Sequence, residues 1–173
     1  MGNSETKDNP GFLEYVYQLN AGTELTEALQ LSLAEIDALD LAKLKRIALQ
    51  TYAEGKWTLP VIFQHLIDWE RIWCARAILF ARREGSIPDA HDQEIMAANS
   101  NANELAIEQL IEELRIVRQS TILQFASFNA QILETNCKFF EYEMPLSAIG
   151  FTITAHQIHH FKVMEERYFP LDA

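Results

Sequence analysis

The sequence has few residues that interrupt regular structure, with six glycines and five prolines among 173 residues. Its apolar residues recur at intervals of three and four and do not alternate, so the pattern expected of β-strands is scarce. The sequence therefore predicts an all-α fold. It also has only two cysteines, Cys74 and Cys137, which lie far apart and match neither a metal-binding nor a redox motif. This usage is typical of a reduced, intracellular protein.

Positive charge and long apolar runs are also scarce. Fourteen basic residues against 25 acidic residues give a formal net charge of -11, which repels phosphate backbones and anionic lipid headgroups. No stretch approaches the roughly 18 apolar residues of a membrane span, and the polar N-terminus lacks the apolar core of a signal peptide. We therefore expect no nucleic-acid partner, no membrane partner and a cytoplasmic location. The length of the chain favours a single domain over residues 1–173.

Helix-starting and helix-ending residues divide the chain into four long helical segments. Thr58 is the expected cap of the second segment, with Pro60 in its first turn, and Asn103 is the expected cap of the third. Four helices of this length pack most simply as an antiparallel four-helix bundle. The segments run from Thr23 to Leu39, from Thr58 to about Arg83, from Asn103 to about Phe125 and from Pro145 to just before Pro170, with a weaker helix from Leu41 to about Thr51.

Three of the five histidines lie within AHQIHH near the C-terminus. His156 and His160 are four residues apart, so they share one helix face, and that face is otherwise apolar. His65 lies on the inward face of the second long helix, where it can meet the pair. Three inward imidazoles are typical of a metal site, although backbone carbonyls or the rings themselves could also satisfy them. A metal held by three histidines keeps a position for water or substrate, whereas a purely structural metal usually has four protein ligands.

Other side chains near His65 are weaker candidates. His159 flanks the histidine pair and is best interpreted as a packing residue or a neighbour of the ligands. Asp68 lies about 60° from His65 in a polar stripe, which favours a solvated or ion-paired carboxylate over a catalytic base. Arg76 is on the inner face and could bind a carboxylate. Trp69, like Trp57 and Trp73, fits the core or a pocket wall, while Cys74 is on the opposite side from His65 and His91 lies in a loop.

The segments GKWTLPVIFQHLIDWER, RAILFARREG and AHQIHHFKVMEERYFP occur in this order, and with them the chain resembles the DinB/YfiT-like superfamily. The resemblance covers nearly the whole chain. It implies a four-helix bundle, usually dimeric, in which one histidine of the second helix and two histidines of the last helix bind a divalent metal. The corresponding residues here are His65, His156 and His160. The family name is not evidence for a reaction on DNA, and the net charge of -11 argues against DNA binding.

Two functions follow from this interpretation. The first is a metal-dependent enzyme whose Zn²⁺ or Ni²⁺ lowers the pKa of a water for hydrolysis, or binds a low-molecular-weight thiol for transfer or isomerisation. The resemblance implies the thiol chemistry, and the residues do not choose between the two reactions. The second is a non-catalytic dimeric bundle in which the metal serves stability or binding.

The second long helix is apolar on two sides, which bears on the oligomeric state. Besides the face of His65, it carries a second apolar stripe about 180° away. One bundle core does not easily cover both, so we expect a homodimer, as the resemblance also implies, or burial by the N-terminal segment. The stripe consists of Phe63, Ile67, Cys74, Ile78 and Ala81, and the N-terminal apolar residues are Phe12, Tyr15, Val16 and Leu19.

Overall fold

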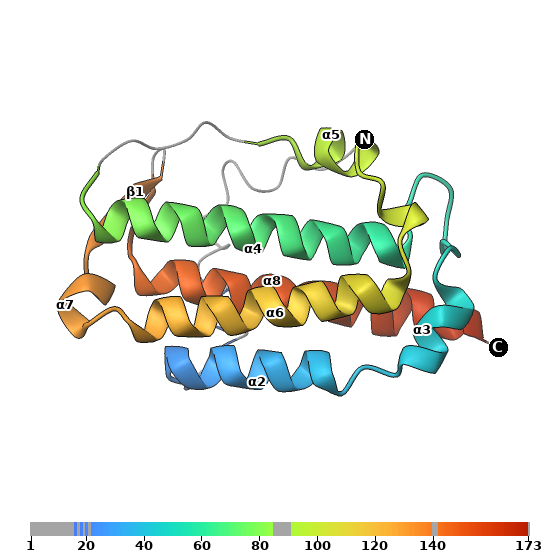
Figure 1. Ribbon diagram of the computed structural model, residues 1–173, viewed down its shortest axis with the longest axis horizontal. Coiled ribbons are helices and arrows are strands. Elements are labelled where there is room, and N and C mark those ends of the chain that lie inside the picture. The colour runs from blue at the N-terminus through green and yellow to red at the C-terminus, as the bar shows by residue number, and fades with distance from the viewer. Residues whose placement is uncertain are drawn as a thin grey trace.

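A computed structural model describes residues 16, 18, 20, 22–84, 91–139 and 142–172. Four long helices lie side by side and form a bundle, as Figure 1 shows. They are α2 (Leu25–Asp37), α4 (Leu59–Ala81), α6 (Ile107–Ala126) and α8 (Ser147–Val163). The predicted all-α four-helix bundle is confirmed.

The directions of the helices differ from the predicted antiparallel arrangement, because two of the neighbouring pairs are parallel. α4 packs against both α6 and α8, and α2 packs against the same two helices from the other side. α4 and α6 run in the same direction, as do α2 and α8, while the pairs α4–α8 and α2–α6 are antiparallel (Figure 1). For α6 to run parallel to α4, the chain must return along the whole length of α4, which is about 34 Å. Segment 82–106 is long enough to span this distance. This crossover contains the short helix α5 (Gln93–Ala98) and the 3₁₀ turn η1 (Ala102–Glu104).

The predicted helix starts are right for α4 and wrong for α6. Thr58 is the N-cap residue of α4, but its hydroxyl donates to Oδ1 of Asn103 at 2.5 Å and does not bond the helix itself. Asn103 lies in η1, three residues before the actual N-cap of α6, Ala106. The backbone N–H of Ala106 donates to Oε1 of Gln109 at 3.1 Å. Asn103 therefore joins the start of α4 to the crossover and does not cap α6.

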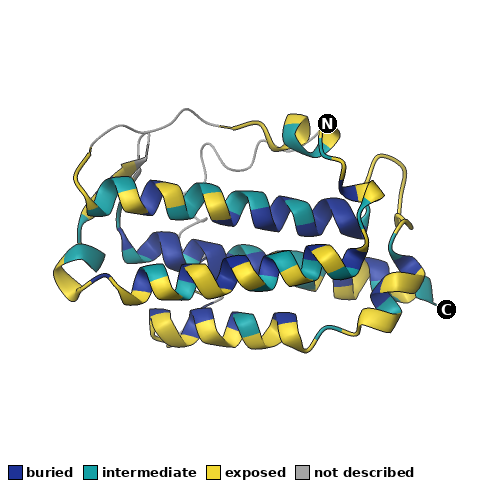
Figure 2. Ribbon diagram, in the orientation of Figure 1, coloured by how far each residue is buried: buried dark blue, intermediate teal, exposed yellow. Residues whose placement is uncertain are grey.

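The bundle core covers the N-terminal part of the second apolar stripe of α4, so the expectation that one core could not cover both sides is wrong for that part. Phe63 and Ile67 are fully buried in a cluster with Leu110 and Leu114 of α6. The buried inner faces and exposed outer faces of the helices are visible in Figure 2. The C-terminal part of the second stripe is less covered, and Ile78 is 43% exposed. Of the N-terminal apolar residues, Val16 is fully buried, and Phe12, Tyr15 and Leu19 lie outside the described residues.

The remaining elements are short. The weaker predicted helix is α3 (Leu41–Ile47), and α7 (Ala130–Leu133) follows α6. An antiparallel hairpin of β1 (Asn136–Phe139) and β2 (Tyr142–Pro145) was not predicted, and it places Pro145 at the end of a strand, two residues before α8. α8 continues past Val163 as a π-helical turn η2 (Met164–Tyr168) and a 3₁₀ turn η3 (Phe169–Asp172). Within the described ranges, no helix is long and apolar enough to cross a membrane.

Candidate metal centre

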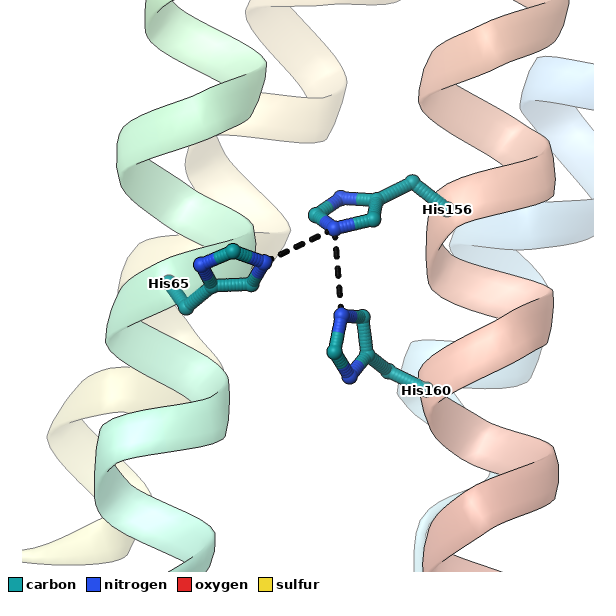
Figure 3. A group of neighbouring side chains, drawn as sticks. All are labelled: His65, His156 and His160. Carbon is teal, nitrogen blue, oxygen red and sulfur yellow. Dashed lines mark hydrogen bonds between the residues drawn. The ribbon is translucent and has the colours of Figure 1, made fainter. Parts of the chain in front are cut away.

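Three histidine rings meet between α4 and α8. His65 comes from the second turn of α4, and His156 and His160 come from successive turns of α8. Nε2 of His156 lies 2.9 Å from Nε2 of His65 and 3.1 Å from Nε2 of His160, as Figure 3 shows. One ring nitrogen from each histidine lies within 4.8 Å of the others. The structure therefore places the three imidazoles predicted from the sequence around one point.

The three nitrogens cannot all satisfy one another. A neutral imidazole nitrogen carries either one proton or one lone pair, so Nε2 of His156 can form one good hydrogen bond but not two. A cation accepts all three lone pairs at once. Three nitrogens bound to a tetrahedral ion at about 2.1 Å would lie roughly 3.4 Å apart, close to the spacing seen for His156. The donor set and its geometry fit a divalent transition metal.

Burial keeps these rings neutral, which is the form that binds a metal. Burial, with a smaller effect of a charge at His159, lowers the pKa of His65 to about 4. Burial also lowers the pKa of His156 and of His160 well below the usual value, and charge on the neighbouring histidines acts in the same direction. The three imidazoles therefore present lone pairs at neutral pH.

Three tryptophans surround the histidines. The ring centroid of Trp57 lies 4.9 Å from that of His65, and the centroid of Trp73 lies 5.0 Å from that of His156. Trp69 is 6.3 Å from His65 and 5.4 Å from Trp73. These indoles pack beside the cluster, and Trp57 and Trp73 also pack against the hydrophobic core.

Comparison with known proteins places the chain in a family. The DinB superfamily pattern matches residues 24–164. The chain belongs to the DinB superfamily. Its structure is similar to that of YfiT from Bacillus subtilis, described as a probable metal-dependent hydrolase with an unusual four-helix bundle topology, with a TM-score of 0.64 and 14% sequence identity over 93% of this chain and 88% of that chain. No curated protein matches the sequence significantly.

A buried ion pair that sequence reasoning missed joins the helices beside the histidine cluster. Arg118 of α6 donates from Nε and Nη2 to the two carboxylate oxygens of Glu70 at 2.8 and 2.9 Å, and both side chains are almost fully buried. Arg118 also donates to the hydroxyl of Ser32 on α2, and the Thr121 hydroxyl donates to Glu70 at 2.6 Å. The signal was present, because Arg118 lies on the core face of α6, four residues after Leu114, and a buried charge requires a partner.

His156 is also positioned by its neighbour in the sequence. Gln157 is fully buried and donates from Nε2 to the backbone carbonyl of Ser32 at 2.8 Å and to Glu35 at 3.0 Å. These bonds join α8 to α2. Gln157 therefore fixes the position of His156 along the bundle axis relative to α2.

The other candidate residues are near the triad but outside it. His159 is exposed, with its ring centroid 5.3 Å from that of His160. Asp68 is half-buried and accepts a hydrogen bond from Gln64 of the same helix at 2.8 Å; burial raises the pKa of its carboxyl group. Arg76 is buried on α4, about 16 Å further along the helix than His65, and burial lowers its pKa.

Cys74 and His91, which were not predicted to be metal ligands, also lie outside the triad. Cys74 contacts Thr121 of α6 at 3.2 Å, on the side of α4 that faces away from the histidines. His91 is exposed, and its ring contacts Trp69 with a centroid distance of 6.3 Å.

Proposed function

We propose that this protein is a metal-dependent enzyme acting on a small molecule, with His65, His156 and His160 as ligands of a divalent ion, Zn²⁺ or Ni²⁺. The convergence of three ring nitrogens between α4 and α8 carries the proposal. When bound there, the ion would lower the pKa of a water toward about 7 for hydrolysis or bind the thiolate of a low-molecular-weight thiol for transfer.

The number of ligands favours a reactive centre over a structural one. In the described part of the chain, no cysteine, aspartate or glutamate joins the three histidines as a fourth donor. Structural zinc sites usually have four protein ligands, whereas catalytic sites keep one position for water or substrate. The non-catalytic dimeric bundle is therefore the less supported alternative.

The residues around the open position can bind and shield a substrate. The indoles of Trp57 and Trp73 supply apolar surface beside the ligands. Nε1 of Trp69 is buried and has no hydrogen-bond partner among the described residues, so its N–H can donate to a polar atom of a substrate. Hydrolysis is our first choice of reaction because the similar protein YfiT is described as a probable metal-dependent hydrolase. Thiol transfer remains the second choice.

Metal analysis of protein purified without an affinity tag tests the ligand set. We expect about one ion per chain by mass spectrometry in the wild type, and loss of most of it in His65→Ala, His156→Ala and His160→Ala. His159→Ala is the matched control, because this residue is on the same helix but outside the cluster, and it should keep its metal. Equal metal content in the triad variants and the control would contradict the proposal.

An activity screen then separates the two reactions. The metal-loaded protein is incubated with ester and amide substrates, and separately with electrophiles and low-molecular-weight thiols. Hydrolysis without thiol supports the first choice, and turnover that requires a thiol supports the second. A fully loaded centre whose ion exchanges no water and which turns over neither class would favour the structural alternative.

We also propose that the protein is a cytoplasmic homodimer. Leu123 is 73% exposed and Ile116 is 54% exposed, and they lie two turns apart on the outer face of α6, where a second copy could cover them. Both cysteines, Cys74 and Cys137, are free, as a reducing compartment requires. Light scattering should give twice the chain mass, and Leu123→Glu should give the single-chain mass. A monomeric wild type at micromolar concentration would contradict the dimer.

A further inference from the structure

A small cavity lies beside the metal centre, between α4 and the crossover that follows it. It has a volume of about 10 Å³, and its polar lining consists of Gln64, His65 and Asp68 of α4 and Ser100, which follows α5. This volume matches the space that one water molecule needs, about 10 to 15 Å³, and is too small for a substrate. The cavity is therefore suited to hold a water molecule beside the histidines and is not a substrate-binding pocket.

Two polar groups in its wall have unused hydrogen-bonding capacity. The hydroxyl of Ser100 is buried and has no hydrogen-bond partner among the described residues. Among the described residues, the half-buried carboxylate of Asp68 accepts one hydrogen bond, from Gln64 at 2.8 Å, and its partial burial raises its pKa. A carboxylate can accept several bonds and a hydroxyl can both donate and accept, so a water between them would satisfy both.

His65 connects this cavity to the metal centre. Its Nε2 faces His156 at 2.9 Å, and in Figure 3 its other ring nitrogen, Nδ1, points away from the two other rings. Since Nε2 faces His156 and His65 also lines the cavity, we infer that Nδ1 is the nitrogen on the cavity side. Histidines that bind a metal through one nitrogen generally donate the N–H of the other to a carboxylate, a carbonyl or a water, which fixes the tautomer and the orientation of the ring.

We propose that one water occupies the cavity and joins the Nδ1–H of His65 to Asp68 and Ser100, which makes Asp68 a positioning residue for His65. The N–H donates to the water, and the water donates to the carboxylate. The link holds His65 in the tautomer whose Nε2 lone pair points at the other two histidines. Its effect on metal binding rests on the proposed function, whereas its effect on the tautomer of His65 does not.

Metal affinity in single variants tests the first consequence. We expect Asp68→Asn to raise the dissociation constant for Zn²⁺ about tenfold or more at pH 7.5, measured by competition with a chelating dye, because loss of such a supporting group costs that much in other metal sites. Ser100→Ala should raise the dissociation constant by a smaller factor. In the double variant the dissociation constant should rise by less than the product of the two single factors, because both side chains act through one water. Thermal unfolding checks that each variant is folded.

The matched control is Glu113→Gln. It removes one negative charge from the neighbouring helix α6, where Glu113 pairs with Arg71 at 2.7 Å, and it does not line the cavity. Its affinity for Zn²⁺ should stay within about twofold of the wild type, as expected for an exposed charge. If Glu113→Gln weakens binding as much as Asp68→Asn, the effect is one of net charge and the positioning role of Asp68 is refuted.

The tautomer of His65 in metal-free protein is the second readout. Long-range ¹H–¹⁵N spectra should show the Nδ1–H form in the wild type and a mixture with the Nε2–H form in Asp68→Asn. If the wild type binds no metal but its tautomer depends on Asp68, the proposed function fails and the water link stands. If neither the tautomer nor the affinity changes in Asp68→Asn, the link is refuted.

Discussion

Acidification is expected to destabilise the metal-free protein, and His65 sets the minimum size of the effect. Its pKa is about 4 in the folded chain, because burial opposes the charged ring, against about 6.5 when unfolded. At pH 7.5 the ring is neutral in both states, so it does not change the free energy of unfolding. At pH 5 it is charged in the unfolded state and neutral in the folded state, which removes about 2 kcal/mol of stability.

The loss begins as the pH falls below 6.5 and is complete below the folded pKa, near 4. His156 and His160 shift in the same direction and add to it. Bound metal holds the rings neutral and stabilises the folded state, by about 2.7 kcal/mol when the free ion is at 100 times its dissociation constant. Because protons compete for the same nitrogens, this gain should be large at pH 7.5 and small at pH 5.

Urea unfolding at pH 7.5 and pH 5.0, with chelator and with added Zn²⁺ or Ni²⁺, measures these terms. Without metal, the wild type should lose at least about 2 kcal/mol between the two pH values, and His65→Asn should lose about 2 kcal/mol less than the wild type. His91→Asn is the control, because His91 is exposed and outside the triad, and it should behave as the wild type. An identical pH dependence in wild type and His65→Asn, or a metal-induced gain that is equal at both pH values, would refute the reasoning.

Two further changes test the packing that supports the site. Arg118→Met leaves the buried carboxylate of Glu70 without its partner and should lower the free energy of unfolding by about 3 to 5 kcal/mol. Its control, Arg71→Met, breaks an exposed pair between the same two helices and should cost less than about 1 kcal/mol. Equal urea midpoints in the two variants would contradict this expectation. Gly150→Ala places a Cβ 2.7 Å from Cδ1 of Leu25, where α8 approaches α2, and should cost about 1 to 3 kcal/mol, which an unchanged melting temperature would contradict.

The candidate ligands could be predicted from the sequence because helical periodicity is local. The spacing of His156 and His160 places both on one face of any helix, and their apolar neighbours point that face inward. The same helical periodicity indicated that His65 lies on the inward side of α4. Short irregular elements carried no comparable signal, so the hairpin of β1 and β2 was missed and Asn103, a good capping residue, was assigned to the wrong role.

The tertiary structure decided which helix faces contact each other and which residues lie at the same level along the bundle axis. His65 and His156 are 91 residues apart and come within 2.9 Å because α4 and α8 are antiparallel neighbours. The partners Glu70 and Arg118 are 48 residues apart and face each other because the crossover makes α4 and α6 parallel.

The same crossover brings Ser100 to the cavity beside His65. The sequence by itself therefore determined the helices, their buried faces and the histidine pair, since backbone hydrogen bonds impose the helical period locally. The order of the helices, the third histidine's contact, the buried ion pair and the cavity depended on the folded structure, because they result from packing between segments whose relative positions no local pattern encodes.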